Sequence, residues 1–240
     1  MPKPTITESQ CQAARVAGIL YFLTALIAPI GLLYVPGKLI VTGDAAATAE
    51  RIRSSEWLLR LGIGAELVPQ IIGIFVVLSL FRLFKPVDEK QAVLMLILGG
   101  LISIPIMFLS VLNEIAALIL VSGADYLSVF NRSQLDALAY LFLRLHGQGL
   151  VLASIFWGLW LFPFGILVIR SGFIPCVLGY LLMIAGVGYV ASSFTTLLLP
   201  QYAGLVGQIA MVLYFGELPI IFWLLIWGTR LKPYPAPAPI

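Results

Sequence analysis

The sequence predicts an all-α fold: a polytopic transmembrane helical bundle with six spans and two short interfacial helices on its outer face. The first observation behind this prediction is composition, because 61% of the 240 residues are hydrophobic and only 10% are charged. The mean hydropathy is +1.05, and a soluble domain of this length could not cover so much apolar surface. The second observation is the arrangement of the apolar residues in six long runs. These runs cover residues 15–35, 57–84, 91–121, 138–169, 174–199 and 204–229.

The first run follows a polar N-terminal segment, residues 1–14, which we expect on the cytoplasmic side. Val16–Val35 is too long for the core of a signal peptide and lacks a clear small-x-small cleavage site. We therefore expect it to remain as the first helix of one transmembrane domain, residues 15–230. Residues 231–240 are rich in proline, and this composition favours a disordered tail.

Two connections on the outer side are long enough to hold structure of their own. They precede the second and fourth runs and cover residues 36–56 and 122–137. Asp44 can cap a helix in the first connection, and aromatic residues followed by Ser133 occupy the second. We expect a short helix lying at the membrane interface in each of them.

The Lys and Arg residues indicate which end of the bundle faces the cytoplasm. Of the 14, eight fall on the side that holds both termini and the two tight loops, and six fall on the other side. Because cytoplasmic loops carry the excess of positive charge, both termini are expected in the cytoplasm. No basic block interleaved with aromatic residues is present, so we expect the lipid bilayer as a partner and no nucleic acid.

No sequence motif of a known catalytic site occurs in the chain. Gly-x-Ser-x-Gly, His-Glu-x-x-His, a phosphate-binding loop and a dinucleotide fingerprint are all absent. Cys11 and Cys176 match no metal-ligand spacing and are expected as reduced thiols. His146 is the single histidine and has no His, Cys or Asp three or four residues away, so no metal site is predicted. A haem axial ligand remains an alternative that rests on this one residue, and no cofactor is identified.

Several ionisable or amide side chains lie inside the predicted spans, in the outer half or near mid-depth. A charged group at the bilayer centre costs at least ~2.5 kcal/mol, so these groups are expected to face one another or a wet cavity. The candidate ligand-binding residues are His146, Glu217, Glu66, Glu114, Asn113 and Gln148, and the candidate structural ion pairs involve Arg60 and Arg144. The alternatives are a histidine bonded to a neighbouring helix, carboxyl groups paired with these arginines, and arginines that reach the interface.

The spacing of Arg144 and His146 separates their directions, because two residues on a helix differ by about 200° of rotation. We expect His146 to face the bundle and Arg144 to reach the outer interface. Glu217 is the deepest acid, and we expect it to line one shared cavity with His146, with Glu66, Asn113 or Glu114 in the wall. The cavity is expected to be closed on its cytoplasmic side by an aromatic layer: Trp157, Trp160 and Trp223.

Several short motifs resemble those of one family of bacterial membrane proteins. They include Arg170-Ser-Gly-Phe-Ile-Pro175 after the fourth span, Leu145-His-Gly-Gln-Gly149 and Gly216-Glu-Leu218. Over about residues 14–230 the chain resembles the proteins catalogued as domain of unknown function 4386. The resemblance implies a six-helix integral membrane protein without an established activity, and the histidine and glutamate of the last two motifs match the family's pattern. The chain departs from that pattern at Glu114, where a small aliphatic or aromatic residue is more usual.

These observations favour an integral protein of the bacterial cytoplasmic membrane that binds a small or amphiphilic ligand in a polar cavity opening outward. A transporter or permease is the first alternative, although no clear inverted repeat is present. The second is a membrane-embedded enzyme that uses His146 and Glu217 as an acid–base pair. The third is a structural subunit of a membrane complex. The identity of the ligand, the protein partners and the oligomeric state are left open.

Overall fold

The computed structural model describes residues 8–229. The Pro-rich tail, residues 231–240, and the first half of the predicted N-terminal segment lie outside the described residues. The second half of that segment is helical, because α1 begins at Glu8 rather than near residue 15. Across residues 8–229 the chain is helical throughout, with turns and no strand.

Six helical stretches are long and apolar enough to cross a membrane, which confirms the predicted all-α bundle. They are Glu8–Leu39, Glu56–Phe84, Glu89–Val121, Arg132–Ser171, Cys176–Leu198 and Pro200–Ile226. Three of them are continuous helices: α4 (Glu56–Phe84), α7 (Arg132–Ser171) and α8 (Cys176–Leu198). The other three contain changes of helix type. The first span consists of α1 (Glu8–Pro29), η1 (Ile30–Tyr34) and α2 (Val35–Leu39), and the third consists of α5 (Glu89–Leu96), η2 (Ile97–Ile102) and α6 (Ser103–Val121). The sixth consists of η4 (Pro200–Tyr202), α9 (Ala203–Tyr214), η5 (Phe215–Glu217) and α10 (Leu218–Ile226).

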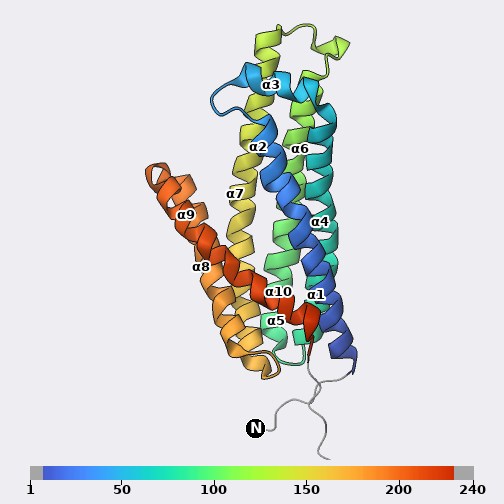
Figure 1. Ribbon diagram of the computed structural model, residues 1–240, viewed down its shortest axis with the longest axis vertical. Helices are drawn as coiled ribbons and strands as arrows, with labels where there is room; N and C mark the ends of the chain where they lie inside the picture. The colour runs from blue at the N-terminus through green and yellow to red at the C-terminus, as the bar shows by residue number, and fades with distance from the viewer. Residues whose placement is uncertain (1–7, 230–240) are drawn as a thin grey trace, which may run out of the picture.

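The end of the bundle opposite the start of α1 and the end of α10 carries one short helix and one short turn (Figure 1). The helix is α3 (Ala45–Ser54), whose N-terminus is capped by Asp44, as predicted. The second connection holds only a single 3-10 turn, η3 (Asp125–Leu127), in place of the expected second interfacial helix. The reason is local: Asn131 and Gln134 form a capping box that starts α7 at Arg132, so few residues are left for a separate helix.

Ion pairs between segments distant in the sequence lie at both ends of the bundle. At the end that carries α3, Arg53 of α3 donates to Asp136 of α7, and Arg132 Nη2 lies 2.7 Å from Glu50 Oε2. At the opposite end Arg170 donates to Asp88, which caps α5. The backbone N–H of Gln91, followed by the Arg170 side chain, lowers the pKa of Asp88. These contacts join connections that are distant in the sequence.

The six spans pack in chain order, each against the next (Figure 1). α1 packs on α4, α4 on α6, α6 on α7, α7 on α8 and α8 on α9, and α10 returns to α1 and closes the ring. The α7–α8 contact is close because Gly165 and Gly179 face each other, and a Cβ on either would lie 2.6 Å from the other's carbonyl oxygen. The start of α1 and the end of α10 lie on the same side of the bundle (Figure 1), where Thr229 Oγ1 donates to Cys11 Sγ at 2.8 Å.

Candidate functional site

His146 lies inside the bundle and meets two carboxylates from neighbouring spans. Its Nε2 atom is 3.3 Å from Oε1 of Glu66 on α4 and 3.8 Å from Oε1 of Glu114 on α6. All three residues are buried, and none is more than 4% exposed. We call these three residues the His146 cluster. They are the one group among residues 8–229 in which three side chains of the metal-ligating kinds converge, with one ligand atom of each within 4.8 Å of the others.

Close helix packing positions the cluster. Gly149 of α7 lies against Ser110 of α6, where any Cβ would overlap the serine side chain. This approach sets the Ser110 carbonyl oxygen 3.2 Å from His146 Nδ1. Asn113 Nδ2 donates to the same oxygen at 3.1 Å. On the other side Gly31 of η1 covers Glu66, because a Cβ on Gly31 would lie 2.6 Å from Glu66 Cγ.

The hydrogen bond to Ser110 determines which nitrogen of His146 carries a proton. A carbonyl oxygen can only accept, so Nδ1 is the donor in this contact. In the neutral imidazole Nε2 then presents a lone pair toward the two carboxylates. Nε2, both Glu66 oxygens and Glu114 Oε2 are buried and have no hydrogen bond of acceptable geometry with any described residue. The arrangement therefore gathers electron-pair donors around one point.

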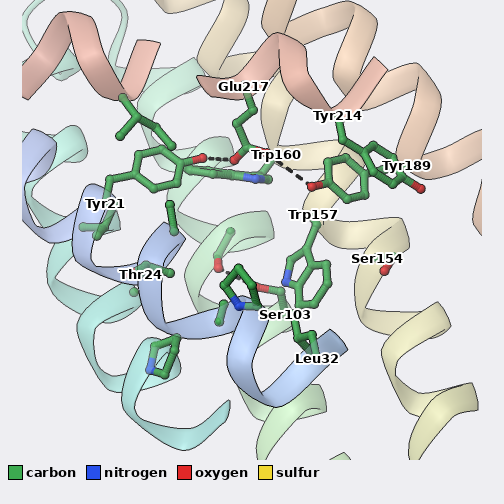
Figure 2. A pocket seen from close by; sticks show the side chains of 18 of the residues that line it. Tyr21, Thr24, Leu32, Ser103, Ser154, Trp157, Trp160, Tyr189, Tyr214 and Glu217 are labelled. Atoms are coloured by element: carbon green, nitrogen blue, oxygen red, sulfur yellow. Dashed lines mark hydrogen bonds between the residues drawn. The ribbon is translucent and has the colours of Figure 1, made fainter. Parts of the chain in front are cut away.

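A second polar site lies deeper in the bundle, in a cavity of about 600 Å³. Glu217 lines this cavity, and two tyrosine hydroxyls point at its carboxylate (Figure 2). Tyr21 Oη donates to Oε1, and Tyr189 Oη donates to Oε2 at 3.4 Å. We call this cavity the Glu217 pocket. Glu217 is the only ionisable acid or base in its lining apart from tyrosines, so no basic lining residue balances its charge.

The pocket has an aromatic wall. Tyr21 lies beside Trp160 with ring centroids 6.0 Å apart, and Trp157 lies 6.4 Å from Tyr189. Tyr189 in turn stacks on Tyr214 at 4.0 Å. Trp157 and Trp160, which the sequence predicted as part of a layer closing the cavity, are therefore parts of its lining. The predicted polar cavity differs from this pocket, whose walls are mainly aromatic and aliphatic.

Irregular helix geometry converges on the Glu217 pocket, which is lined from all six spans. The π-turn η1 follows Pro29, and the π-turn η2 contributes Gly99 to the lining. The sixth span changes to a 3-10 turn at η5, which ends two residues before Pro219 in the first turn of α10. Proline has no N–H, so the helix cannot continue its hydrogen bonds through that point. Non-helical backbone at membrane depth is tolerated where protein or a cavity surrounds it, and π-turns are frequent at functional sites.

The pocket opens sideways between η1 and α9. Most lining residues are buried or half-buried, and the exposed ones are confined to the end of α1 with η1 and to α9 with η5. Leu33 is 65% exposed, Met211 58% and Phe215 63%. Because these rim side chains are apolar, the mouth suits a lipid environment better than water.

The structure separates His146 from Glu217. His146, Glu66, Glu114 and Asn113 are not part of the pocket lining, which ends on α4 at Pro69 and Gln70. Gln70 Nε2 donates to the Glu66 backbone oxygen at 3.4 Å, so on α4 the cluster lies about one turn, roughly 6 Å, from the pocket on the side toward Glu56. The expected single shared cavity is thus two adjacent sites: the Glu217 pocket and the His146 cluster, where α6 packs on both α4 and α7.

The remaining predicted residues lie outside both sites. Arg144 is exposed while His146 is buried, as the helical spacing predicted. Arg144 and Gln148 border a separate hollow of about 290 Å³ on another face of α7. Arg144 has no ion pair with any residue from 8 to 229, and Arg60 pairs with Glu56 at 2.7 Å on the exposed face of α4. Neither arginine meets a carboxylate of the His146 cluster.

Sequence reasoning missed the tyrosines of the Glu217 pocket. A tyrosine in an apolar helix usually indicates packing or an interface, so Tyr21 and Tyr189 gave no separate signal. The available signal was the position of each tyrosine along its span. Tyr21 of α1 and Tyr189 of α8 lie at the same height in the bundle as Glu217, and both donate to it. Gly99 was another, because a Cβ there would lie 2.8 Å from Trp160 Cε3 and push that ring out of the wall.

Comparison with known proteins identifies relatives but no activity. The profile of the family described as "Domain of unknown function (DUF4386)" matches residues 16–228. A protein of Archaeoglobus fulgidus described as "Uncharacterized protein" is 40% identical over 81 residues, which are 34% of this chain and 47% of that protein. The chain thus spans about half the length of the curated relative that it matches. No solved structure matches the chain.

Proposed function

The chain belongs to the DUF4386 family of membrane proteins, and we propose that it binds a lipophilic organic cation, such as an amine with apolar substituents, in the Glu217 pocket. One observation carries this proposal: a single carboxylate lies in a mainly apolar, aromatic cavity without a basic partner in the lining. A buried charge is costly unless it is paired. A cationic ligand would supply the missing partner.

The aromatic wall supports a cation as the ligand. Ammonium groups are attracted to the faces of tyrosine and tryptophan rings within about 6 Å, and each such contact is worth roughly 0.5–2 kcal/mol. Tyr21, Trp157, Trp160, Tyr189 and Tyr214 all line the pocket. An anion would meet the same ring faces and Glu217 unfavourably. The lining therefore favours positive charge over negative charge on the same molecular shape.

The size and mouth of the pocket support an amphiphile that arrives from the bilayer. A volume of about 600 Å³ falls within the range of ordinary small-molecule sites, roughly 300–1,000 Å³. The exposed rim residues Leu33, Met211 and Phe215 are apolar. A ligand dissolved in the acyl chains could pass between η1 and α9 without crossing water.

The test uses two probes of the same shape and opposite charge. Equilibrium dialysis of the detergent-solubilised protein is expected to show binding of tetraphenylphosphonium in preference to tetraphenylborate. Glu217→Gln keeps the shape and removes the charge, so we expect it to weaken tetraphenylphosphonium binding about 10- to 100-fold, the range for a lost contact with a charged group. Glu89→Gln, a change at an exposed acid on α5, is the control and should bind like the wild type. Equal binding of both probes, or a Glu217→Gln variant that binds normally, would refute the proposal.

Transport of the bound cation is the second candidate function. The observation that favours it is the change of helix type in the first and sixth spans, which flank the mouth. Transporters often build binding sites from interrupted helices near mid-membrane. Proteoliposomes should then accumulate tetraphenylphosphonium in a manner that Glu217→Gln abolishes. An acid–base enzyme using His146 with Glu217 finds less support, because the two side chains belong to different sites.

We further propose that the protein lies in the bacterial cytoplasmic membrane with both termini inside. The positive-inside count supports this orientation, with eight of 14 basic residues on the side of the termini. In a background where Cys11 and Cys176 are serine, a membrane-impermeant maleimide added to cells should label a cysteine at Ala46. It should miss one at Glu89 until the membrane is permeabilised, and the reverse pattern would overturn the orientation.

A further inference from the structure

The His146 cluster contributes no residue to the Glu217 pocket, yet it brings two carboxylates and an imidazole together away from water. Glu66 is the extreme case: its side chain is 0% exposed, and neither oxygen has a hydrogen bond of acceptable geometry with a described residue. Buried carboxylate oxygens without a hydrogen bond are rare, since each one loses its hydration. We propose that Glu66, Glu114 and His146 bind one divalent transition-metal ion.

The distances suit a metal ion at the centre of the three ligand atoms. Zinc bonds to histidine nitrogen and carboxylate oxygen of about 2.0–2.2 Å place neighbouring ligands of a tetrahedron roughly 3.3 Å apart. His146 Nε2 lies 3.3 Å from Glu66 Oε1 and 3.8 Å from Glu114 Oε1. All three ligand atoms lie within 4.8 Å of one another. Small rotations of Glu114 would bring its oxygen into the same shell.

The orientation of His146 is that of a metal ligand. Metal-bound histidines almost always donate their second ring N–H to a carboxylate or backbone carbonyl, which fixes the ring and leaves the other nitrogen free to coordinate. Here Nδ1 donates to the Ser110 carbonyl oxygen at 3.2 Å, and Nε2 faces the carboxylates. Asn113 donates to the same carbonyl oxygen and so helps to hold it in place.

Charge and ligand type select the class of ion. Two carboxylates and one neutral imidazole carry a charge of −2, which a divalent cation neutralises. An imidazole ligand suits zinc, iron, copper or nickel, whereas calcium prefers six to eight oxygen ligands and magnesium keeps an octahedral oxygen shell. The ion would connect α4, α6 and α7, the three spans that supply the ligands.

The metal content of the purified protein tests the proposal. The protein is treated with a chelator, reloaded with Zn²⁺ or Co²⁺ and desalted. Elemental mass spectrometry should then find one metal ion per chain. Co²⁺ should also give visible absorption of a low-coordinate site, which is lost when Zn²⁺ displaces it. Single variants Glu66→Gln, Glu114→Gln and His146→Gln should each lose the stoichiometric ion and the Co²⁺ spectrum, with affinity falling at least tenfold.

Two controls keep this result separate from the function of the pocket. Glu217→Gln should retain a full metal content, because Glu217 is not a ligand, even if it loses cation binding. Wild-type protein should melt at a higher temperature with Zn²⁺ than after chelation, whereas a folded His146→Gln variant should show no such shift. If folded wild-type protein takes up no more metal than His146→Gln, the cluster shares protons instead, and the metal site is refuted.

Discussion

The His146 cluster and the Glu217 pocket both hold carboxylates inside the bundle, but the space around them differs. In the cluster α6 packs on both α4 and α7, and three ligand atoms lie within 4.8 Å of one another. In the pocket the helices separate around about 600 Å³, and one carboxylate at the wall receives two tyrosine hydroxyls. Close packing suits a single ion, whereas an open aromatic cavity suits a molecule. Under the two proposals, the same residue type serves different chemistry according to helix packing.

The largest expected effect is on the packing that closes the cluster. Gly31→Ala adds a Cβ 2.6 Å from Glu66 Cγ and 2.9 Å from the Gly62 carbonyl oxygen, so η1 must move away from α4. We expect a loss of about 1–3 kcal/mol in unfolding free energy, together with weaker metal binding. Gly37→Ala, on the next helix, has no atom within 4 Å and should be nearly neutral. Unfolding in a titrated denaturing detergent measures both, and equal stability of the two variants would contradict the close packing.

Filling the pocket should affect the other site alone. Gly73 lines the cavity, and a Cβ there meets only Ile104 Cδ1 at 3.7 Å, so Gly73→Leu can enter the open space without strain. We expect at least a tenfold loss of tetraphenylphosphonium affinity with unchanged metal content. Gly64→Leu on the same helix is the matched control, because its Cβ meets nothing within 4 Å and it does not line the pocket. Loss of metal from Gly73→Leu would show that the two sites are not separate.

A smaller effect is expected from the hydroxyl that holds Glu217. Tyr21→Phe removes a buried donor to this carboxylate, which should cost about 1 kcal/mol of stability in the ligand-free protein. Tyr34→Phe is the control, because Tyr34 is exposed on the surface of η1. Thermal unfolding in detergent compares the two. An unchanged melting temperature for Tyr21→Phe would mean that the hydroxyl contributes nothing to holding Glu217.

The smallest effect concerns Asp88, outside both sites. Its pKa in the folded protein lies below the ordinary value of 3.8, chiefly because of the Gln91 N–H. A lowered pKa stabilises the folded protein at pH values above the ordinary pKa. This contribution disappears as the pH falls through the pKa of the folded state. Asp88→Asn should therefore be slightly less stable than the wild type at neutral pH, and the difference should shrink below pH 3.8. Melting temperatures across that range check the sign, and a difference that grows in acid would contradict it.

Much of the fold follows from the sequence because each span is a continuous apolar run. The interfacial helix after Asp44 was also predictable, since its cap and its helix-forming residues are local. The second connection does not hold the expected helix, because the Asn131 capping box starts α7 at Arg132, earlier than the hydropathy of the fourth run indicates. The inward direction of His146 followed from helical spacing and is confirmed by its 4% exposure.

The composition of the two sites depends on packing that local patterns do not encode. No metal site is predicted from the sequence, because His146 has no His, Cys or Asp three or four residues away. The two carboxylates that meet His146 in the structure come from other spans. The glycines at positions 31 and 149 allow those spans to meet, and only contact geometry shows which residues they admit. Conversely, His146 and Glu217 both lie within apolar runs, and nothing local shows that the packing of α4, α6 and α7 would separate them.

The most direct test of two independent sites measures both ligands on the same four proteins. Wild type, Glu66→Gln, Glu217→Gln and the double variant would each be assayed for Co²⁺ content and for tetraphenylphosphonium affinity. We predict that Glu66→Gln loses the metal and keeps cation binding, that Glu217→Gln does the opposite, and that the double variant loses both. A folded single variant that loses both ligands, or neither, would contradict the account.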